Sequence, residues 1–359
     1  MIIKESSNKI LKILLHKFFR AKNTTILIIW SIILLAAGDF FGERKHALLA
    51  KQKVKDLVSV LQEVDDITIL SNKETVSFDI GFLDMEELDD RRKLAVENYS
   101  LKFVENDYIS ANMHFQGSTF PVKIRLKGST SKDHHGGKKW SFKVKLTDDS
   151  RFMGMKSFSL MNPKRQNFMI AWLYRMALKD EGVISKKYGF INVSINGNDM
   201  GLYAFDEEFD KTMIESNQRR DGPILSFQDD SFWLEKAAFA TLPTNEWGDY
   251  YLSAPIEIKD LKDNIITKHS QEAIDLMSAF RRGDLPASKV FDIDKLAKSM
   301  ALGDFFKNSH GFLPFNSVFY YNPITHRLEP IPDDNFNEIR NDSDGVFRYD
   351  DYWMTGIFL

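Results

Sequence analysis

Apolar and polar residues alternate along several short segments of the chain, as they do in strands with one buried face. The alternation is clear in residues 76–82, 122–128 and 140–146. It returns in residues 188–195 and 201–205, on either side of an Asn-Gly pair. Because Asn and Gly both tolerate positive φ, this pair predicts a hairpin. Together the segments predict an antiparallel sheet.

A helical spacing of apolar residues replaces the alternation elsewhere. Residues 165–181 have this spacing and stop at Gly182, a residue suited to ending a helix. Residues 229–265 show no clear period, and we expect a long surface insertion there. Strands combined with helices in this way predict an α+β fold with a helical C-terminal part. Further helices are predicted at residues 44–64, 207–217, 269–282 and 292–307.

The N-terminal region has a charge pattern typical of a membrane anchor. Thr24–Gly38 is an uncharged apolar run of 15 residues, with six lysines or arginines before it and acidic residues after it. This order predicts a cytoplasmic basic segment at 1–23, a signal anchor or transmembrane helix at 24–41 and a juxtamembrane helix at 44–64. The main domain would then be extracytoplasmic.

Two other interpretations of this N-terminal run stay open. Ala36 and Gly38 could form a signal-peptidase site, which would make the run part of a cleaved signal peptide. The run could instead be a buried core helix, although basic residues seldom cluster before such a helix.

Composition narrows the range of functions. Hydrophobic residues make up 43% of the 359-residue chain, enough for a real core, so the chain as a whole is not disordered. A net charge of -3 gives no sign of a nucleic-acid-binding protein, which would be distinctly basic. The absence of cysteine excludes disulfides, thiolate metal sites and cysteine nucleophiles. Partners must therefore be inferred from local features.

Basic residues are concentrated in the predicted strands at 122–146. Strand alternation places Lys123, Arg125 and Lys127 on one face, and Lys143 and Lys145 also share a face. Pairing of the two strands would gather these cations on one surface of the sheet, where they suit a phosphate-rich ligand. The alternative is that these cations bind no ligand and lie on a strand face that contacts only solvent.

A second group of polar residues lies near the C-terminus. Residues 315–321 and 327–332 predict a hairpin that ends at Asp333 and Asp334. Asn316 begins this hairpin, and His310 precedes it. Carboxamide and carboxylate oxygens are ligands that Mg²⁺ takes when it also binds phosphate. The alternative is that the aspartates only form a turn and the asparagine only starts a strand.

Other motifs of catalysis and metal binding are absent from the sequence. It contains no P-loop, no H-E-x-x-H and no G-x-S-x-G. His134 and His135 follow Asp133, but adjacent residues point apart, so the pair is poor evidence for a shared metal ion. We expect these histidines to belong to a loop.

Taken in order, four segments resemble the CotH kinase family, the spore-coat protein H-like proteins. They are VKIRLKGSTSKDHHGGKKWSFKVKL, FMGMKSFSLMNPKRQNFMIAWLYRMALKDEGVIS, NVSINGNDMGLYAFDEEFDKTMI and FNSVFYYNPITHRLEPIPDD. The similarity covers roughly residues 110–340. It implies a divergent protein-kinase-like fold over residues 66–345, with ATP and Mg²⁺ or Mn²⁺ as cofactors and secreted or coat proteins as substrates.

The resemblance also implies roles for individual residues. Lys139 matches a family lysine, and Lys143 and Lys145 continue its strand, so one of the three would contact the ATP phosphates. Glu207 matches the glutamate of the Y-x-x-x-E-x-x-D-K pattern and would orient that lysine, as an ion pair does in ordinary kinases. Asn316 and Asp334 match family positions that would hold the metal, next to Asp333. Arg125 and Lys127 would add to the phosphate site.

The sequence also departs from ordinary kinases. They carry an aspartate five residues before the metal-binding asparagine, to accept the proton of the substrate hydroxyl. Gly311 stands at that position here. His310, beside it, matches a histidine of one bacterial branch of the family and could act as the base near neutral pH. No G-x-G-x-x-G loop is present to cover the nucleotide.

Three hypotheses follow from these observations. The first is a membrane-anchored, extracytoplasmic CotH-like kinase that transfers the ATP γ-phosphate to a hydroxyl of a secreted or envelope protein. The second is a catalytically silent CotH-like scaffold that binds an anionic polymer or a partner in the cell envelope. The third is a transferase that uses another phosphate-bearing donor. Residues 346–359 form a separate C-terminal end, whose last seven residues, Trp353–Leu359, are apolar with no closing signal, and we expect a truncated product.

Overall fold

The computed structural model describes one unit of the chain, Lys73–Leu359, in part. The described residues are 74–98, 101, 107–128, 134–135, 137–228, 254–259, 267–306, 308, 310–312 and 316–333. The predicted anchor, the juxtamembrane helix and residues 346–359 lie outside them. Within the described residues, no helix is both long enough and apolar enough to cross a membrane.

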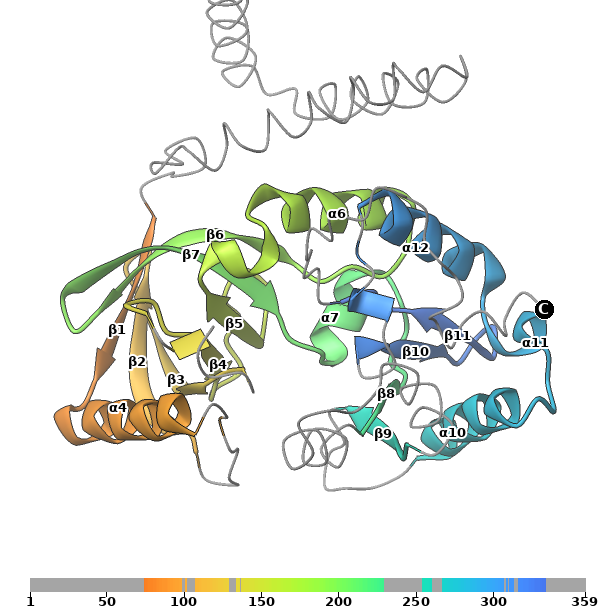
Figure 1. Cartoon of the computed structure of the whole chain (residues 1–359), viewed down its shortest axis with the longest axis horizontal. Coiled ribbons are helices and arrows are strands. Elements are labelled where there is room, and N and C mark those ends of the chain that lie inside the picture. The colour runs from red at the N-terminus through yellow and green to blue at the C-terminus, as the bar shows by residue number, and fades with distance from the viewer. Residues whose placement is uncertain are drawn as a thin grey trace, which may run out of the picture. The chain divides into compact units, whose positions relative to one another are not determined.

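Seven strands form a closed barrel (Figure 1). They are β1 (Thr75–Ile80), β2 (Ile109–Phe115), β3 (Ser118–Leu126), β4 (Phe142–Leu146), β5 (Ser157–Met161), β6 (Tyr188–Ile195) and β7 (Asn198–Glu207). Around the barrel the order is β1-β2-β3-β4-β5-β7-β6. All neighbours are antiparallel except β1 and β6, whose parallel pairing closes the barrel.

The predicted α+β class is confirmed, but the predicted antiparallel sheet is incomplete. The alternating strands were expected to form a sheet, and their inward residues do fill one core, with Val122, Ile124 and Leu126 of β3 as examples. The sheet does not stay open, however, because Thr75 of β1 pairs with Asn192 of β6. Alternation within a strand carries no information about a partner so far away in the chain.

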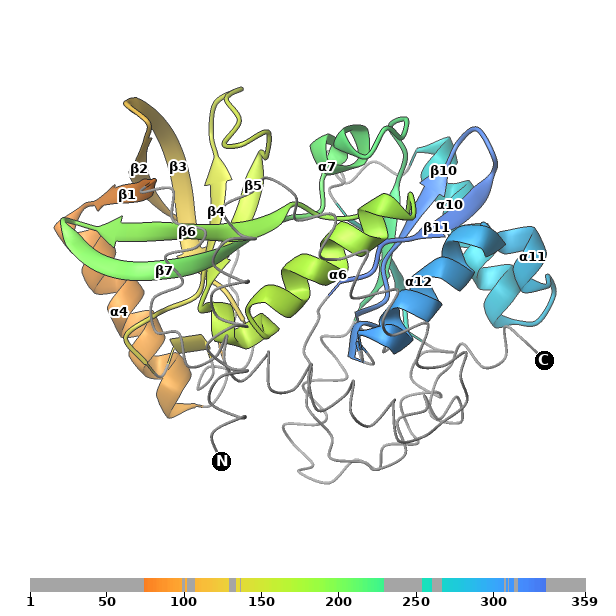
Figure 2. The same cartoon turned by 90° about the horizontal axis from the view of Figure 1, so that it is seen from above.

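Helix α4 (Phe82–Glu97) packs against the barrel, and the apolar pattern of the sequence did not predict it. It lies beside β1, β2 and β3 (Figures 1 and 2). Its buried Leu88 joins the barrel core, whereas Phe82 and Leu83 remain exposed. Because its exposed apolar residues are scattered among charged ones, no apolar stripe marks the helix in the sequence.

The hairpin between β6 and β7 confirms the prediction from Asn196-Gly197. Asn196 has a φ of 49° and Gly197 a φ of 78°, the left-handed conformation that this kind of turn requires. The predicted helix end is also confirmed: helix α6 (Met169–Asp180) stops just before Gly182, which has a φ of 68°. Ala171 of this helix packs with Ala204, so α6 covers part of the outer face of β7.

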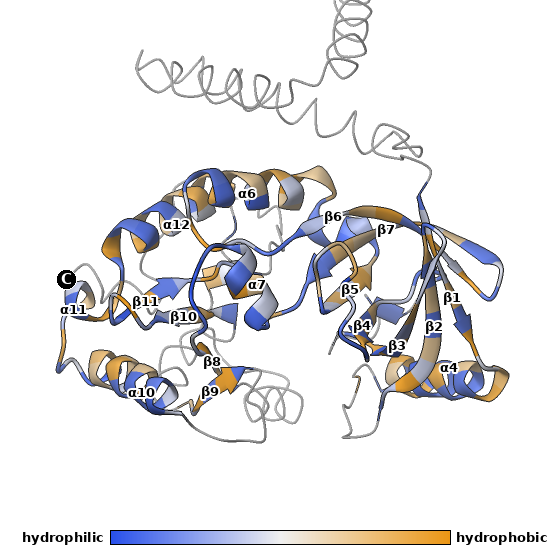
Figure 3. Cartoon of the chain, turned by 180° about the vertical axis from the view of Figure 1, so that it is seen from behind, coloured by the Kyte–Doolittle hydropathy of each residue, from blue (hydrophilic) through white to orange (hydrophobic). Residues whose placement is uncertain are grey.

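A four-stranded sheet in the order β11-β10-β8-β9 and its helices form the rest of the described chain. They enclose a second apolar core, which can be followed in the hydropathy colours of Figure 3. The strands are β8 (Ile224–Phe227), β9 (Ile256–Lys259), β10 (Phe319–Asn322) and β11 (Arg327–Pro330). The helices are α7 (Lys211–Ser216), α10 (Lys268–Arg281), α11 (Ala287–Val290) and α12 (Ile293–Phe305), and short 3-10 turns are η1 (Pro163–Gln166) and η3 (His310–Phe312).

Several predictions in this part are confirmed and one is wrong. Helices α10 and α12 and the β10–β11 hairpin lie where the patterns placed them. The helix predicted at 207–217 begins only at Lys211, because Glu207 still belongs to β7 and Asp210 caps the helix with its carboxylate. Most of the insertion predicted at 229–265 lies outside the described residues, and its described part contains strand β9, which pairs with β8.

Two adjacent histidines, the half-buried His134 and the buried His135, lie between β3 and β4 in the chain. His135 is completely buried, and the Nδ1 of His134 lies 2.9 Å from the Ser141 hydroxyl. Burial lowers the pKa of His134 to about 2 and that of His135 to about 4. Both histidines are therefore neutral in the folded protein near pH 7.

We expect His135 to make the fold acid-sensitive. The stability of the neutral buried ring is fully present above its ordinary pKa of 6.5 and is lost as the pH falls below that value, because the unfolded chain then binds a proton that the folded chain does not. By pH 5 the loss should reach about 2 kcal/mol. Urea unfolding at pH 7.5 and pH 5 should show that wild type loses about this much more stability than His135→Phe.

A buried residue that does not titrate provides the control for this measurement. Phe142→Leu, at the start of β4, removes no titratable group, so it should lose as much stability between the two pH values as wild type does. Equal losses in wild type and His135→Phe would contradict the prediction.

Candidate functional site

The predicted gathering of cations on one surface is confirmed by the pairing of β3 with β4. Lys123 lies opposite Lys145, and Arg125 lies opposite Lys143. Their neighbours along each strand point into the barrel core, so these cations occupy the outer face of the barrel. We call this surface, formed by Lys123, Arg125, Lys127, Lys143 and Lys145, the basic face.

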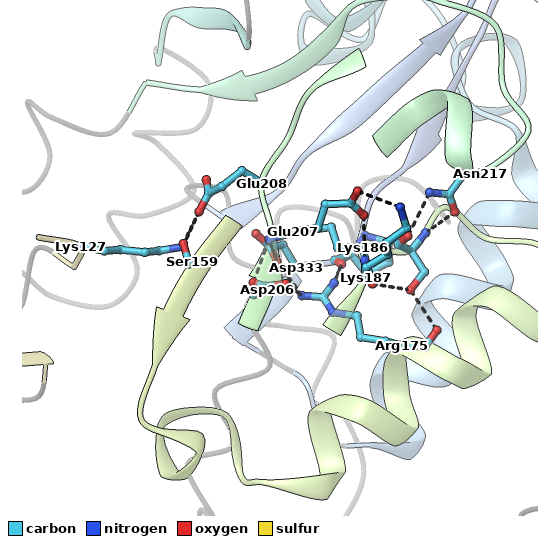
Figure 4. Close-up of polar contacts among 12 residues, drawn as sticks. Lys127, Ser159, Arg175, Lys186, Lys187, Asp206, Glu207, Glu208, Asn217 and Asp333 are labelled. Atoms are coloured by element: carbon cyan, nitrogen blue, oxygen red, sulfur yellow. Dashed lines mark hydrogen bonds and ion pairs between the residues drawn. The ribbon is translucent and has the colours of Figure 1, made fainter. Parts of the chain in front are cut away.

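Two lysines of the basic face, Lys127 and Lys143, converge on the carboxylate of Glu208. Figure 4 shows Lys127 and Ser159 beside this carboxylate. The Lys127 ammonium donates to Glu208 Oε1 at 2.9 Å, and the Lys143 ammonium donates to Glu208 Oε2 at 2.9 Å. Lys127 also donates to the Ser159 hydroxyl at 2.6 Å, and this hydroxyl donates to Glu208. Two cations thus share one anion, and the lysine side chains keep 29% and 27% of their surface exposed. The group of Lys127, Lys143 and Glu208 therefore keeps a net positive charge, which can bind a further anion.

Glu208, rather than the predicted Glu207, contacts the lysines. Successive residues of a strand point to opposite faces, and Tyr203 and Phe205 of β7 fill the barrel core. Glu207 shares their side of the strand, where it accepts the backbone N–H of Lys187 and lies 3.6 Å from its ammonium. Sequence reasoning missed Glu208, although the same alternation could have identified it.

The two glutamates differ in their pKa values as well. Burial favours the neutral form of Glu208, but Lys127 and Lys143 outweigh it and hold the pKa of this carboxyl well below its usual range. Burial instead raises the pKa of Glu207, with only partial compensation from Lys187. Glu208 is therefore firmly ionised beside the two lysines.

A second group of charges lies next to Glu208 and is almost completely buried. Lys186 donates to Asp206 Oδ2 and to Asp333 Oδ1, both at 2.9 Å. Arg175 donates to Asp333 Oδ1 at 2.7 Å and to the carbonyl of Pro332. We call Arg175, Lys186, Asp206 and Asp333 the buried ion cluster (Figure 4). Two cations and two carboxylates make it neutral overall.

The pKa values in the buried ion cluster follow from this pairing. Burial alone would lower the pKa of Lys186, but Asp206 and Asp333 raise it above the usual lysine value. Burial likewise opposes ionisation of Asp333, yet Lys186 and Arg175 hold its pKa below the usual range. For Asp206 burial prevails and raises the pKa. Sequence reasoning missed three of the four residues, because their contacts join α6, β7 and the segment after β11.

The other predicted phosphate-binding residues lie apart from the Glu208 group. The Lys139 ammonium donates to the Leu202 carbonyl at 2.7 Å and lies over the Tyr203 ring, and burial lowers its pKa. Arg125 lies 3.5 Å from Asp107. Lys145 is exposed on the outer side of β4. Of the three lysines that could contact ATP, the structure brings only Lys143 to a carboxylate of the site.

The predicted metal residues are described only in part. Asp334 lies outside the described residues, and Asn316 stands just before β10. Asp333 already accepts from Arg175 and Lys186, both on Oδ1, and keeps 19% of its side chain exposed. Across the described ranges, no group of three or more His, Asp or Glu side chains could hold a metal ion.

Gly311 lies in the turn η3, directly against the segment after β11. A Cβ at this position would lie 2.3 Å from the carbonyl oxygen of Asp333 and 2.6 Å from the Asn308 side chain. Both distances are far shorter than a normal contact, so an aspartate does not fit here without a shift of the backbone. The place where ordinary kinases carry their proton-accepting aspartate is thus closed to that residue, and His310 stands next to it.

Comparison with known proteins gives the family. A family model described as CotH kinase protein matches residues 124–355, nearly two thirds of the chain. No curated protein sequence matches the chain. The matched region includes Lys127, Lys143, Glu208 and the whole buried ion cluster. The resemblance predicted from the sequence motifs is confirmed, and the chain belongs to the CotH kinase family.

Proposed function

We propose that this protein is a metal-dependent kinase that transfers the γ-phosphate of ATP to a hydroxyl group of a protein. The observation that carries the proposal is the Lys127–Lys143–Glu208 group in a chain of the CotH kinase family. Ammonium groups form strong charge-assisted hydrogen bonds with phosphate oxygens. One carboxylate between two lysines leaves positive charge for such oxygens.

The residues fit ATP better than they fit a fully formed metal site. Lys127 and Lys143 are partly exposed and held in place by Glu208, so they would bind phosphate oxygens. For the metal, Asn316 and Asp334 would supply oxygen ligands, as the family resemblance implies. Asp333 would offer only Oδ2, since its two cations both lie on Oδ1. The metal, when bound, would neutralise phosphate charge.

Acid–base chemistry would fall to His310. Gly311 provides no carboxylate and has no room for one. A neutral imidazole can accept the proton of a substrate hydroxyl near neutral pH. Glu208 would act as a positioning residue, because it orients both lysines without being free to take a proton.

We further propose that the kinase works outside the cytoplasm, on a secreted or envelope protein, and that residues 24–41 anchor it to the membrane. The basic flank before this apolar run supports that orientation. The second candidate is a catalytically silent scaffold. It is favoured by Gly311, whose contacts with Asp333 and Asn308 exclude the aspartate of ordinary kinases.

Thermal unfolding of the full chain with and without ATP and Mg²⁺ distinguishes the two candidates. A ligand at 100 times its Kd should stabilise the kinase by about 2.7 kcal/mol. We expect this stabilisation to require the metal and to disappear in Asp334→Ala. Asp284→Ala, which removes an exposed aspartate paired with Arg282, should behave as wild type. No shift at millimolar ATP would exclude the kinase and leave the scaffold.

A further inference from the structure

The basic face places like charges directly opposite each other. Lys123 pairs across the strands with Lys145, and Arg125 pairs with Lys143. Side chains at such positions lie about 5 Å apart at Cβ, and like charges there destabilise a sheet. Two such pairs in succession therefore lower the stability of β3 and β4 unless an anion lies over them.

The carboxylates nearby neutralise only part of this charge. Glu208 is shared by Lys127 and Lys143, and Asp107 lies 3.5 Å from Arg125. Lys123 and Lys145 are exposed, and no carboxylate of the described residues lies within ion-pair distance of either. Among the described residues, two carboxylates face these five cations, and neither of the two lies at the Lys123–Lys145 end, where the excess of positive charge is therefore greatest.

The spacing of these cations matches an extended peptide. Lys123, Arg125 and Lys127 follow each other at every second residue of a strand. A strand rises about 3.3 Å per residue, so Lys123 lies roughly 13 Å along β3 from Lys127. An extended peptide has the same rise, and its alternate side chains also point to one side. Acidic residues at every second position of a peptide would therefore face successive cations.

We propose that the Lys123–Lys145 end of the basic face binds an acidic segment of the protein substrate, about four residues from the hydroxyl that receives the phosphate. This inference rests on the proposed kinase function, which places the phosphates at Lys127 and Lys143. The substrate class is a protein segment with acidic residues two and four positions from a serine, threonine or tyrosine.

Direct binding of a labelled peptide tests the proposal without requiring turnover. The probe is a fluorescent peptide with glutamates two and four residues from a serine, and a peptide with alanines there is its control. Fluorescence anisotropy with the full chain should show tighter binding of the acidic peptide, weakening as salt is added. Lys123→Glu/Lys145→Glu should weaken this binding about tenfold, since it replaces attraction with repulsion.

A charge reversal of the same size elsewhere separates the local effect from net charge. Lys179→Glu/Lys289→Glu alters two exposed lysines, on α6 and α11, and should leave peptide binding unchanged. In kinase assays the double variant of the basic face should raise KM for the acidic peptide about tenfold, with KM for ATP within about twofold of wild type.

The outcomes distinguish this proposal from the kinase function. Equal affinity of wild type and the double variant for the acidic peptide would overturn the docking proposal, whether or not ATP binds. Tighter binding of polyphosphate than of peptide, lost in the same variant, would also overturn it and assign the surface to an anionic polymer. Failure of wild type to bind ATP with Mg²⁺ would overturn the kinase function alone.

Discussion

Replacing Lys186 with methionine is expected to lower the free energy of unfolding by about 3–5 kcal/mol. The side chains of Lys186, Arg175 and Asp206 each keep only 3% of their surface exposed. Without the Lys186 ammonium, two carboxylates would share Arg175, whose closest approach to Asp206 is 3.7 Å. Asp206 would then be a buried charge without a close partner. Urea unfolding followed by circular dichroism measures the loss.

Two further variants test the reason for this loss. Lys298→Met removes a surface lysine, whose side chain is 37% exposed and lies 3.2 Å from Asp294, itself 66% exposed, and should cost about 1 kcal/mol or less. Lys186→Met/Asp206→Asn removes the orphaned charge as well and should recover part of the stability. A loss below about 1 kcal/mol in Lys186→Met would contradict the role assigned to the buried ion cluster.

Replacing both Lys127 and Lys143 with methionine is expected to weaken ATP binding at least about 100-fold. A hydrogen bond to a charged group contributes about 1.5–3 kcal/mol, and 1.4 kcal/mol corresponds to a factor of ten in affinity. The two ammonium groups lie on the same carboxylate and would meet the same phosphate group of the ligand. Titration of the full chain with a fluorescent ATP analogue in Mg²⁺ measures the change.

Lys145→Met is the matched control, because this lysine is exposed on the same strand and makes no contact with Glu208 in the described residues. It should bind the analogue within about twofold of wild type. Circular dichroism should confirm that the double variant is folded, since it leaves Glu208 without its lysines. Unchanged affinity for the ATP analogue in a folded double variant would show that Lys127 and Lys143 do not bind the phosphates of ATP.

Local patterns in the sequence predicted those features that depend on neighbours in the chain. Alternation in β3 and β4 was enough to place five cations on one face, and Asn196-Gly197 was enough to predict a hairpin. The same alternation distinguishes Glu208 from Glu207, because Tyr203 and Phe205 define the inner side of β7. Matching Glu207 to a family pattern did not take the direction of its side chain into account.

Features that depend on distant contacts could not be predicted in this way. The barrel closes through β1 and β6, which are more than a hundred residues apart in the chain. The buried ion cluster joins Arg175 of α6 with Asp333, and no local pattern marks a buried arginine that pairs with a residue after β11. Helix α4 gave no signal because it carries no continuous apolar stripe.

Strand β7 and the residue that follows it contribute one carboxylate to each of the two charged groups. Asp206 contacts Lys186, and Glu208, two residues later, contacts Lys127 and Lys143. A shift of β7 by one residue would turn both carboxylates to the other face. In one direction Phe205 would replace Asp206, and in the other Phe209 would replace Glu208. Either slip puts an aromatic ring where a carboxylate now meets an ammonium group, so the two charged groups together favour the observed alignment of β7 over both neighbouring ones.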